Sequence, residues 1–349
     1  MQTKYYLIDR ESPSPAALSE AATILKEGGL VAFPTETVYG LGGIATQREA
    51  AQRIYAAKGR PSDNPLIIHI AEPSDAERYA YTGELYYRLA EAFMPGPLTV
   101  ILPKRDTIPD TVTGGLDTVA VRCPDHPVAH ALIRETGAAI AAPSANLSGS
   151  PSPTCGAHVK KDLDGRIDAI LDGGSCEIGL ESTIVQIKGD GLVLLRPGAI
   201  TRDALLCVCD RVELAPSITE ALAENERPLS PGMKYKHYAP AVPLVLLEGE
   251  AEDVISFLRH AQNTERCAIL CYHEELDHLR FERLIDIGAK QDLAEQAQAL
   301  FGALRKADEL DADIIYAHLP PKDGLGLALY NRLIRAAAHT VRHISQKDL

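Results

Sequence analysis

Residues 58–69 read Lys58-Gly59-Arg60-Pro61-Ser62-Asp63-Asn64-Pro65-Leu66-Ile67-Ile68-His69. The two prolines fix φ at their own positions and disfavour helix at the residues before them, so the stretch predicts a stiff turn that presents Lys58 and Arg60. The apolar run that follows predicts a short buried strand. A cationic turn held by a core strand suits an anionic ligand such as a polyphosphate. A solvated turn is the simpler interpretation of these two cations taken alone.

Two other predicted strands end in loops of related composition. The apolar residues 30–33 lead into PTETVYGLGG at residues 34–43, where glycines allow the backbone to approach a ligand closely. A second apolar run at residues 139–142 leads into PSANLSG at residues 143–149. Hydroxyl and amide side chains therefore follow both strands, in loops of the kind that often carry binding residues.

The alternation of predicted helices and strands along 349 residues indicates an α/β protein with more than one domain. We expect a first domain at residues 1–205, a linker at 206–242 and a small parallel α/β domain at 243–349. Within the last domain the apolar spacing predicts helices at residues 292–307 and 325–341. Residues 230–240 combine prolines, a glycine, tyrosines and cations, which is not the composition of a flexible spacer. We interpret them as a lid over the first domain's site, with simple packing between the domains as the alternative.

Composition argues against several classes of protein. Hydrophobic residues make up 46% of the chain, and no apolar run approaches the roughly 18 residues of a membrane helix. The first residues lack a signal-peptide pattern, so we expect a cytoplasmic protein. The 7 cysteines include no C-x-x-C pair, so neither a disulfide framework nor a zinc site is indicated. The net charge of −13 leaves no basic half that could grip nucleic acid.

The sequence contains no GxxxxGK[ST], GxGxxG, HExxH or GxSxG motif. The candidate site is instead a set of cations, hydroxyls and amides at strand ends, with few carboxylates. That composition favours the positioning of an anionic ligand over acid–base hydrolysis. The members of the set are Thr35, Lys58, Arg60, Asn64, His69, Arg122, Ser144, Asn146, Ser182 and Arg196.

Each member also has a structural interpretation when it is taken singly. Arg122, at the end of an apolar strand, could pair with a structural carboxylate. His69 could be a satisfied core histidine. Turn capping is the alternative for the small polar residues, namely Thr35, Ser144, Asn146 and Ser182.

Taken together, these segments resemble a known family. PTETVYGLG, KGRPSDNPLIIH, AVRCPDHP, APSANLSGSPSPT, ESTIV and LLRPG occur here in the order typical of the YrdC-type threonylcarbamoyl-AMP synthases. SPGMKYKHYAP followed by a small α/β domain is similar to the longer, two-domain form of that family. The resemblance runs from about residue 10 to the end of the chain. It implies a YrdC-like twisted mixed sheet with helices, joined by an ordered linker to a Rossmann-like parallel α/β domain.

The resemblance implies an L-threonylcarbamoyladenylate synthase, a nucleotidyltransferase that joins L-threonine, bicarbonate and ATP and releases pyrophosphate. A separate tRNA threonylcarbamoyltransferase would then modify the adenosine beside the anticodon. The implied catalytic residues are Lys58 and Arg60. The implied threonine-binding residues are Thr35, His69, Arg122, Ala142 and Ser182. The implied ATP-binding residues are Lys58, Arg60, Ser62, Asn64, Thr118, Ser144, Asn146, Ser152, Arg196, Tyr235, His237 and Tyr238.

The resemblance also bears on cofactors and partners. Mg²⁺ is expected with ATP, because a triphosphate needs charge neutralisation and the loops offer oxygen ligands. Ser144, Asn146 and Ser152 would line the nucleotide or its metal, and no prosthetic group is expected. No membrane partner is expected, and weak tRNA binding stays open. Two other classes stay open as well. One is an RNA-binding module without ATP turnover. The other is a carbamoyltransferase that uses carbamoyl phosphate, although the acylphosphatase-like region and zinc-finger cysteines usual in that class are not seen in the sequence.

Overall fold

The computed structural model describes residues 2–220, 237–280 and 282–345. The chain divides into two compact units. The first consists of Met1–Ser148 and Ser152–Tyr235, and the second consists of Gly149–Pro151 and Lys236–Leu349. A three-residue piece from the middle of the first unit's sequence therefore belongs to the second unit.

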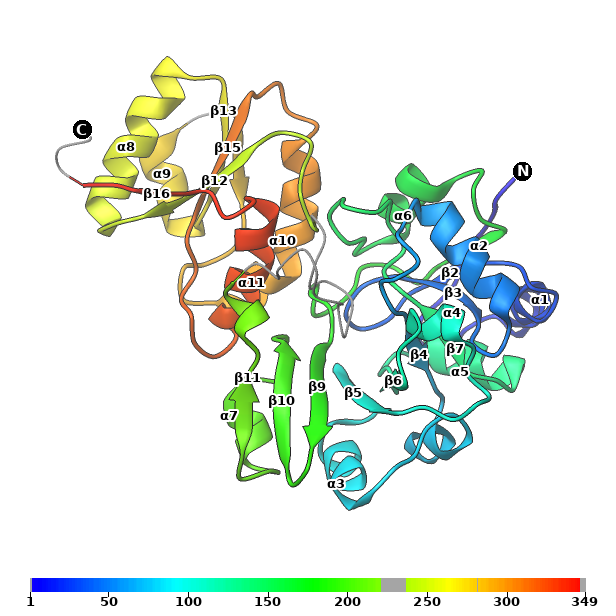
Figure 1. Ribbon diagram of the computed structural model, residues 1–349. Coiled ribbons are helices and arrows are strands. Elements are labelled where there is room, and N and C mark those ends of the chain that lie inside the picture. The colour runs from blue at the N-terminus through cyan, green and yellow to red at the C-terminus, as the bar shows by residue number, and fades with distance from the viewer. Residues whose placement is uncertain (1, 221–236, 281, 346–349) are drawn as a thin grey trace. The chain divides into compact units, whose positions relative to one another are not determined.

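The first unit is built on a mixed sheet of 11 strands in the order β1-β8-β2-β3-β7-β4-β6-β5-β9-β10-β11 (Figure 1). Parallel pairs such as β4 with β6 occur beside antiparallel pairs such as β5 with β6. The predicted mixed sheet is confirmed. The strands are β1 Lys4–Leu7, β2 Val31–Phe33, β3 Gly40–Ile44, β4 Ile67–His69, β5 Leu98–Pro103, β6 Thr118–Arg122, β7 Ile140–Ala142, β8 Ala169–Asp172, β9 Thr183–Lys188, β10 Gly191–Arg196 and β11 Val212–Leu214.

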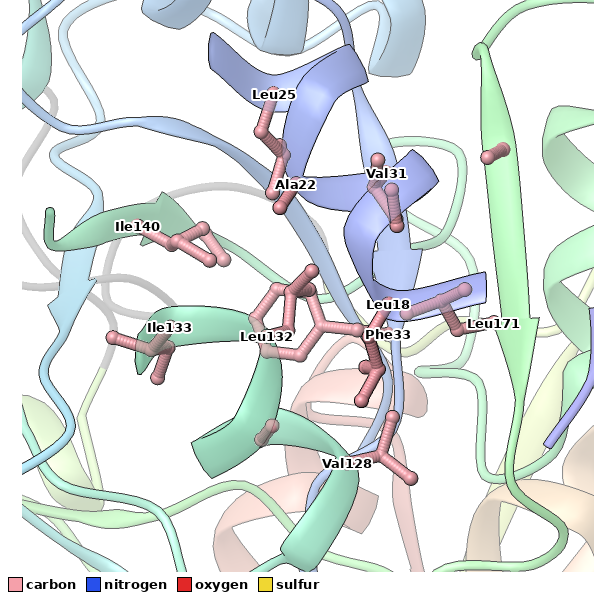
Figure 2. Close-up of a cluster of buried hydrophobic side chains, with 14 of the residues drawn as sticks. Leu18, Ala22, Leu25, Val31, Phe33, Val128, Leu132, Ile133, Ile140 and Leu171 are labelled. Carbon is pink, nitrogen blue, oxygen red and sulfur yellow. The ribbon is translucent and has the colours of Figure 1, made fainter. Parts of the chain in front are cut away.

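Two helices of the first unit, α1 and α5, form much of its core. Leu18 and Leu25 of α1 and Leu132 of α5 lie on apolar faces at helical spacing and are buried against Phe33 at the end of β2. Figure 2 shows these side chains gathered around Phe33. This packing fixes the end of β2, where the loop at residues 34–39 begins. The helices and 3₁₀ turns are α1 Pro15–Lys26, α2 Arg48–Lys58, η1 Pro73–Arg78, α3 Glu84–Phe93, α4 Asp110–Thr113, α5 Pro127–Thr136, α6 Gly156–Leu163, α7 Arg202–Leu206 and η2 Pro216–Ile218.

The second unit is a sheet of 5 parallel strands in the order β14-β13-β15-β12-β16. Helices α8 and α9 cover one face and α10 and α11 cover the other (Figure 1). The predicted small parallel α/β domain is confirmed. Its elements are β12 Leu244–Glu248, α8 Ala251–Thr264, β13 Cys267–Cys271, η3 His273–Glu275, α9 Leu276–Leu279, β14 Leu284–Asp286, α10 Leu293–Ala307, β15 Ile314–His318, α11 Gly326–Ala336 and β16 Val341–His343.

Some elements differ from the sequence-based expectation. The glycine-rich segment expected as a loop contains strand β3, where a Cβ on Gly42 would lie 2.7 Å from Ile140 Cγ2. Glycine is therefore needed for strand packing there. The helix expected over residues 325–341 ends at Ala336, and β16 follows it. Residues 206–220, which the pattern assigned to the linker, include β11, and β11 pairs with β10 in the large sheet.

Helix length bears on membrane insertion. Within the described ranges the longest helix, α10, has 15 residues, whereas a bilayer crossing takes roughly 20 apolar ones. None of the helices in those ranges is long and apolar enough to cross a membrane.

Candidate functional site

A row of polar side chains crosses neighbouring strands of the first sheet. His69 ends β4 and lies opposite Arg122, which ends β6. Arg122 in turn lies opposite Thr99, near the start of β5. The hydroxyl of Thr99 is 2.7 Å from the hydroxyl of Ser182, the residue before β9. All four side chains are buried, so polar groups from distant parts of the sequence meet inside the unit.

Arg196 extends this row. It ends β10, where the register with β9 shifts next to it, and such bulges commonly redirect a side chain. Its Nε donates to the Ser182 carbonyl oxygen at 3.0 Å, and its Nη2 donates to Ser182 Oγ at 3.1 Å. The turn after Arg196 packs tightly, because a Cβ on Gly198 would lie 2.6 Å from the backbone nitrogen of Thr183. The sequence segments ESTIV and LLRPG therefore meet in space.

Arg122 faces a carboxylate to which the sequence pattern assigned no role. Its Nη2 lies 2.8 Å from Oε1 of Glu36, and the two side chains are 5% and 4% exposed. Despite this short distance, Nε and Nη2 of Arg122 and both Glu36 carboxylate oxygens make no aligned hydrogen bond within the described part of the chain. Buried charges with spare hydrogen-bonding capacity are costly unless something completes them. The pairing of Arg122 with a carboxylate is thus observed, and the pair retains capacity for a ligand.

His69 is packed but not fully satisfied. Its ring lies edge-on to Phe33 with centroids 6.0 Å apart. Nδ1 is buried and has no hydrogen-bond partner among the residues that the structure describes. Burial, together with the charge of Arg122, lowers the pKa of His69 to about 3. The imidazole beside Arg122 is therefore neutral at physiological pH.

This buried neutral imidazole predicts a pH dependence of stability. The pKa of His69 is about 3 in the folded protein, whereas an ordinary histidine, as in the unfolded chain, has a pKa of 6.5. The unfolded chain therefore takes up the proton first as the pH falls. The stabilisation is complete above about pH 6.5 and is lost as the pH falls towards 3. In this pH window we expect the free energy of unfolding of the His69→Gln variant to depend less on pH than that of the parent protein. The difference in slope is up to about 1.4 kcal/mol per pH unit. Urea denaturation of both proteins checks this, and parallel pH profiles would contradict it.

Lys58 is the last residue of α2, so it does not project from a loop as residues 58–61 predicted. It is 2% exposed. Its ammonium donates to the carbonyl oxygens of Ser144 at 2.6 Å and Asn146 at 2.5 Å. The Ser144 hydroxyl donates to Asn146 Oδ1 at 2.5 Å within the same loop. One buried cation therefore ties residues 143–149 to the end of α2.

Arg60 lies in the expected turn but is also buried. Its guanidinium donates through Nη2 to the carbonyl oxygens of Asn64 at 3.3 Å and Pro65 at 3.1 Å. Asn64 is 1% exposed, and its Oδ1 has no hydrogen-bond partner within the described ranges. Ser62 is exposed on the turn. Arg60 thus shapes the turn that leads into β4.

The loop at residues 34–39 lies beside both the Arg122 row and the loop that Lys58 contacts. Its Glu36 faces Arg122. The backbone nitrogen of Tyr39 donates to the Pro153 carbonyl at 2.9 Å, and its carbonyl accepts from the Ala145 nitrogen at 2.8 Å. The Lys58 group and the Arg122 row therefore border the same loop.

The remaining predicted residues of the first unit have varied surroundings. The Thr35 hydroxyl donates to the Val38 carbonyl at 2.7 Å, so its turn-capping role is observed. Ala142 ends β7 and is buried. The Ser152 hydroxyl donates to Glu181 at 2.5 Å. Thr118 begins the strand that Arg122 ends. Four residues of strand put it about 13 Å from Arg122.

The predicted residues near the linker have a different outcome. Tyr235 and residues 230–236 of the expected lid lie outside the described residues. His237 and Tyr238 belong to the second unit. Tyr238 is 4% exposed and stacks on Phe301 of α10, with centroids 5.3 Å apart. Packing within the second unit is thus observed for Tyr238, and its contact with ATP stays a prediction.

The row and loop include polar residues that the sequence-based set omitted, namely Glu36, Thr99 and Glu181. Glu36 lies within the segment PTETVYGLG and Glu181 within ESTIV, so their place in these segments could have identified them as candidate site residues. Thr99 is a polar residue in an otherwise apolar buried strand, which is a weaker signal.

Comparisons with known proteins bear on both units. The family model described as "Telomere recombination" matches residues 23–198. The model described as "Threonylcarbamoyl-AMP synthase, C-terminal domain" matches residues 200–338. A threonylcarbamoyl-AMP synthase of Bacillus subtilis is 46% identical over 347 residues, which cover 98% of this chain and 99% of the relative. One of Pyrococcus abyssi is 41% identical, with coverage of 92% of this chain and 94% of the relative.

Solved structures agree with these matches. The crystal structure of P. abyssi Sua5 complexed with L-threonine aligns with a TM-score of 0.90 at 39% identity, covering 98% of this chain and 100% of that one. Escherichia coli YciO, with a TM-score of 0.52 at 24% identity, covers 56% of this chain and 96% of its own and shows the fold alone. Since relatives match nearly the full length and family models match both units, the chain belongs to the threonylcarbamoyl-AMP synthase family.

Proposed function

We propose that this chain is a cytoplasmic L-threonylcarbamoyladenylate synthase. It makes threonylcarbamoyl-AMP and pyrophosphate from L-threonine, bicarbonate and ATP, for threonylcarbamoyladenosine modification of tRNA beside the anticodon. The observation that carries the proposal is the buried pair of Arg122 and Glu36, 2.8 Å apart with spare hydrogen-bonding capacity. A guanidinium beside a carboxylate matches the two charges of an amino acid. The names of the relatives, one of them solved with L-threonine, support the assignment.

Threonine would bind across this pair. Arg122 would hold the substrate carboxylate with two parallel N–H donors, the arrangement in which arginine binds carboxylates most strongly. Glu36 would accept the ammonium and take up a proton from it, which leaves a nucleophilic amine. Neutral His69 would present Nδ1 without adding charge. Thr35, Ala142 and Ser182 would complete the pocket around the side chain.

The reaction needs no protein nucleophile. The threonine amine would attack the carbon of bicarbonate, and loss of water would give the carbamate. A carbamate oxygen would then attack the α-phosphorus of ATP, and pyrophosphate would leave with the bridging oxygen. Lys58, Arg60 and Arg196 would stabilise the charge that develops on the phosphates, since phosphoryl chemistry depends chiefly on position and charge neutralisation.

Magnesium fits this site as an ion carried by the nucleotide. No group of three or more His, Cys, Asp or Glu residues suited to a metal occurs in the described ranges. The loop beside Lys58 offers the hydroxyl and amide oxygens of Ser144 and Asn146, which are ligands that Mg²⁺ accepts alongside phosphate oxygens. When bound, the ion would supply positive charge to the triphosphate.

We expect pyrophosphate release to require L-threonine, bicarbonate and ATP together. All three are required because threonine supplies the amine, bicarbonate the carbon and ATP the phosphorus of the product. The measurement is a coupled assay with the full chain in which each substrate is omitted in turn. Release of equal size without threonine would contradict the proposal. Release driven by carbamoyl phosphate would favour a carbamoyltransferase, and tight RNA binding without any turnover would favour a binding module.

A further inference from the structure

The second unit contains a pocket of about 760 Å³ that the proposed reaction does not use. It opens at the carboxyl edge of the parallel sheet. Its lining comes from the ends of β12 and β15, from Tyr272 directly after β13, and from the loops that precede α10 and α11. Volumes of this size suit a ligand as large as a nucleotide.

The topology of the sheet favours a ligand at this place. Strands β13 and β15 are neighbours in the order β14-β13-β15-β12-β16. The chain leaves β13 towards β14 at one edge, and it leaves β15 towards β16 at the other edge. Connections that diverge from neighbouring parallel strands leave a crevice outside their carboxyl ends, where ligands of open α/β sheets bind.

The floor of the pocket carries an aromatic pair held by a buried carboxylate. The rings of Tyr272 and His318 stack with centroids 4.6 Å apart and an interplanar angle of 22°. His318 Nε2 lies 2.9 Å from Oε1 of Glu275, and Glu275 also accepts the backbone N–H of Tyr272 at 3.0 Å. Tyr272 and Glu275 are each 7% exposed. These contacts fix the imidazole in one orientation at the base of the pocket.

The rim of the pocket carries cations from two different loops. Lys290 precedes α10, Lys322 precedes α11, and both side chains are exposed. The Lys322 ammonium lies over the ring of Tyr330, 4.8 Å from its centroid, which positions it at the rim. The lining also carries two carboxylates, those of Asp323 and Glu248, and the Glu248 carboxylate lies 2.8 Å from His343 Nδ1. The two lysines, which come from separate loops, are the groups in the lining that an anion would contact.

We propose that this pocket binds a nucleoside phosphate. The phosphate would lie between Lys290 and Lys322, because two lysines from facing loops can neutralise one phosphate group. The flat base would lie on the apolar and aromatic floor formed by Tyr272, His318 and Leu319. All residues that line the pocket belong to the second unit, and none has a role in the proposed reaction, so the proposal does not rest on that reaction.

Hydrogen exchange of the full chain, read by mass spectrometry with millimolar AMP, adenosine or pyrophosphate, tests the site without turnover. AMP is expected to protect residues 290–297 and 318–326, whereas adenosine is not. Lys290→Ala and Lys322→Ala are each expected to weaken this protection by about tenfold in AMP concentration. Lys306→Ala, an exposed lysine at the far end of α10, is the matched control and should leave it unchanged.

Four results would contradict the nucleoside phosphate site or one of its parts. Absence of protection in these segments at millimolar AMP would overturn the site. Protection that both lysine variants retain would overturn the role of the cations. Equal protection by adenosine would show that the phosphate group is not recognised. Equal protection by pyrophosphate would show that the nucleoside is not recognised. Pyrophosphate release from threonine, bicarbonate and ATP is expected to be unchanged in the lysine variants, which separates this site from that of the first unit.

Discussion

Replacing Arg122 by alanine is expected to reduce threonine-dependent pyrophosphate release by at least about a hundredfold. The variant removes the guanidinium that would bind the substrate carboxylate in a buried site, and truncation of a buried charge contact costs about 2–5 kcal/mol. Arg122→Lys is also expected to fail, because an ammonium cannot supply two parallel donors. Steady-state kinetics with threonine as the varied substrate measure the effect.

The same substitution is expected to destabilise the fold, and the control must separate the two effects. Arg122→Ala leaves Glu36 buried without its partner, which costs about 3–5 kcal/mol. The double variant Arg122→Met with Glu36→Gln removes both charges and keeps the volume, so it should recover most of the thermal stability. It should remain inactive. A stable double variant that turns over threonine would show that the pair is structural only.

Lys58→Ala is expected to lower turnover on the order of tenfold to a thousandfold, as loss of a phosphate-stabilising cation does in a site without water. The sequence places Lys58 on a turn, where replacement of a lysine would be expected to change stability little. Because its ammonium holds the Ser144 and Asn146 carbonyls, the structure instead predicts a loss of about 1–3 kcal/mol in the free energy of unfolding. Turnover assays and urea denaturation of the same preparations measure both quantities.

Lys26→Ala provides the matched control for Lys58→Ala. Lys26 also stands in the last turn of a helix, α1, but its side chain is exposed. Its removal is expected to leave both activity and stability nearly unchanged, since exposed surface substitutions usually change stability by about 0.5 kcal/mol or less. If Lys58→Ala behaves like Lys26→Ala, Lys58 neither binds phosphate nor holds the loop.

The elements that the sequence predicted well are those with a strong local signal. The helix expected at residues 292–307 is observed as Leu293–Ala307, because apolar residues recur on one face and Asp292 caps its first turn. The short strand after Pro65 is observed as β4 for the same kind of reason. Strand β3 was missed because its glycines suggest a turn locally, whereas packing against Ile140 and Phe33 requires them.

The contacts among the predicted site residues depend on long-range pairing that no local sequence pattern specifies. His69 and Arg122 are brought together by the pairing of β4 with β6, which no local pattern specifies. The partner of Arg122 stands 86 positions earlier in the chain, and only the fold shows that it is Glu36. Likewise, the cation of Lys58 was recognised from its motif, but its contacts with residues 143–149 depend on the approach of α2 to the end of β7.

The most direct test is to incubate the full chain with L-threonine, carbon-13 bicarbonate and ATP and to analyse the products by mass spectrometry. The predicted result is threonylcarbamoyl-AMP with one heavy carbon, accompanied by pyrophosphate, and loss of both products with Arg122→Ala. Formation of pyrophosphate and AMP from ATP without any threonine adduct that carries the label would contradict the proposed function.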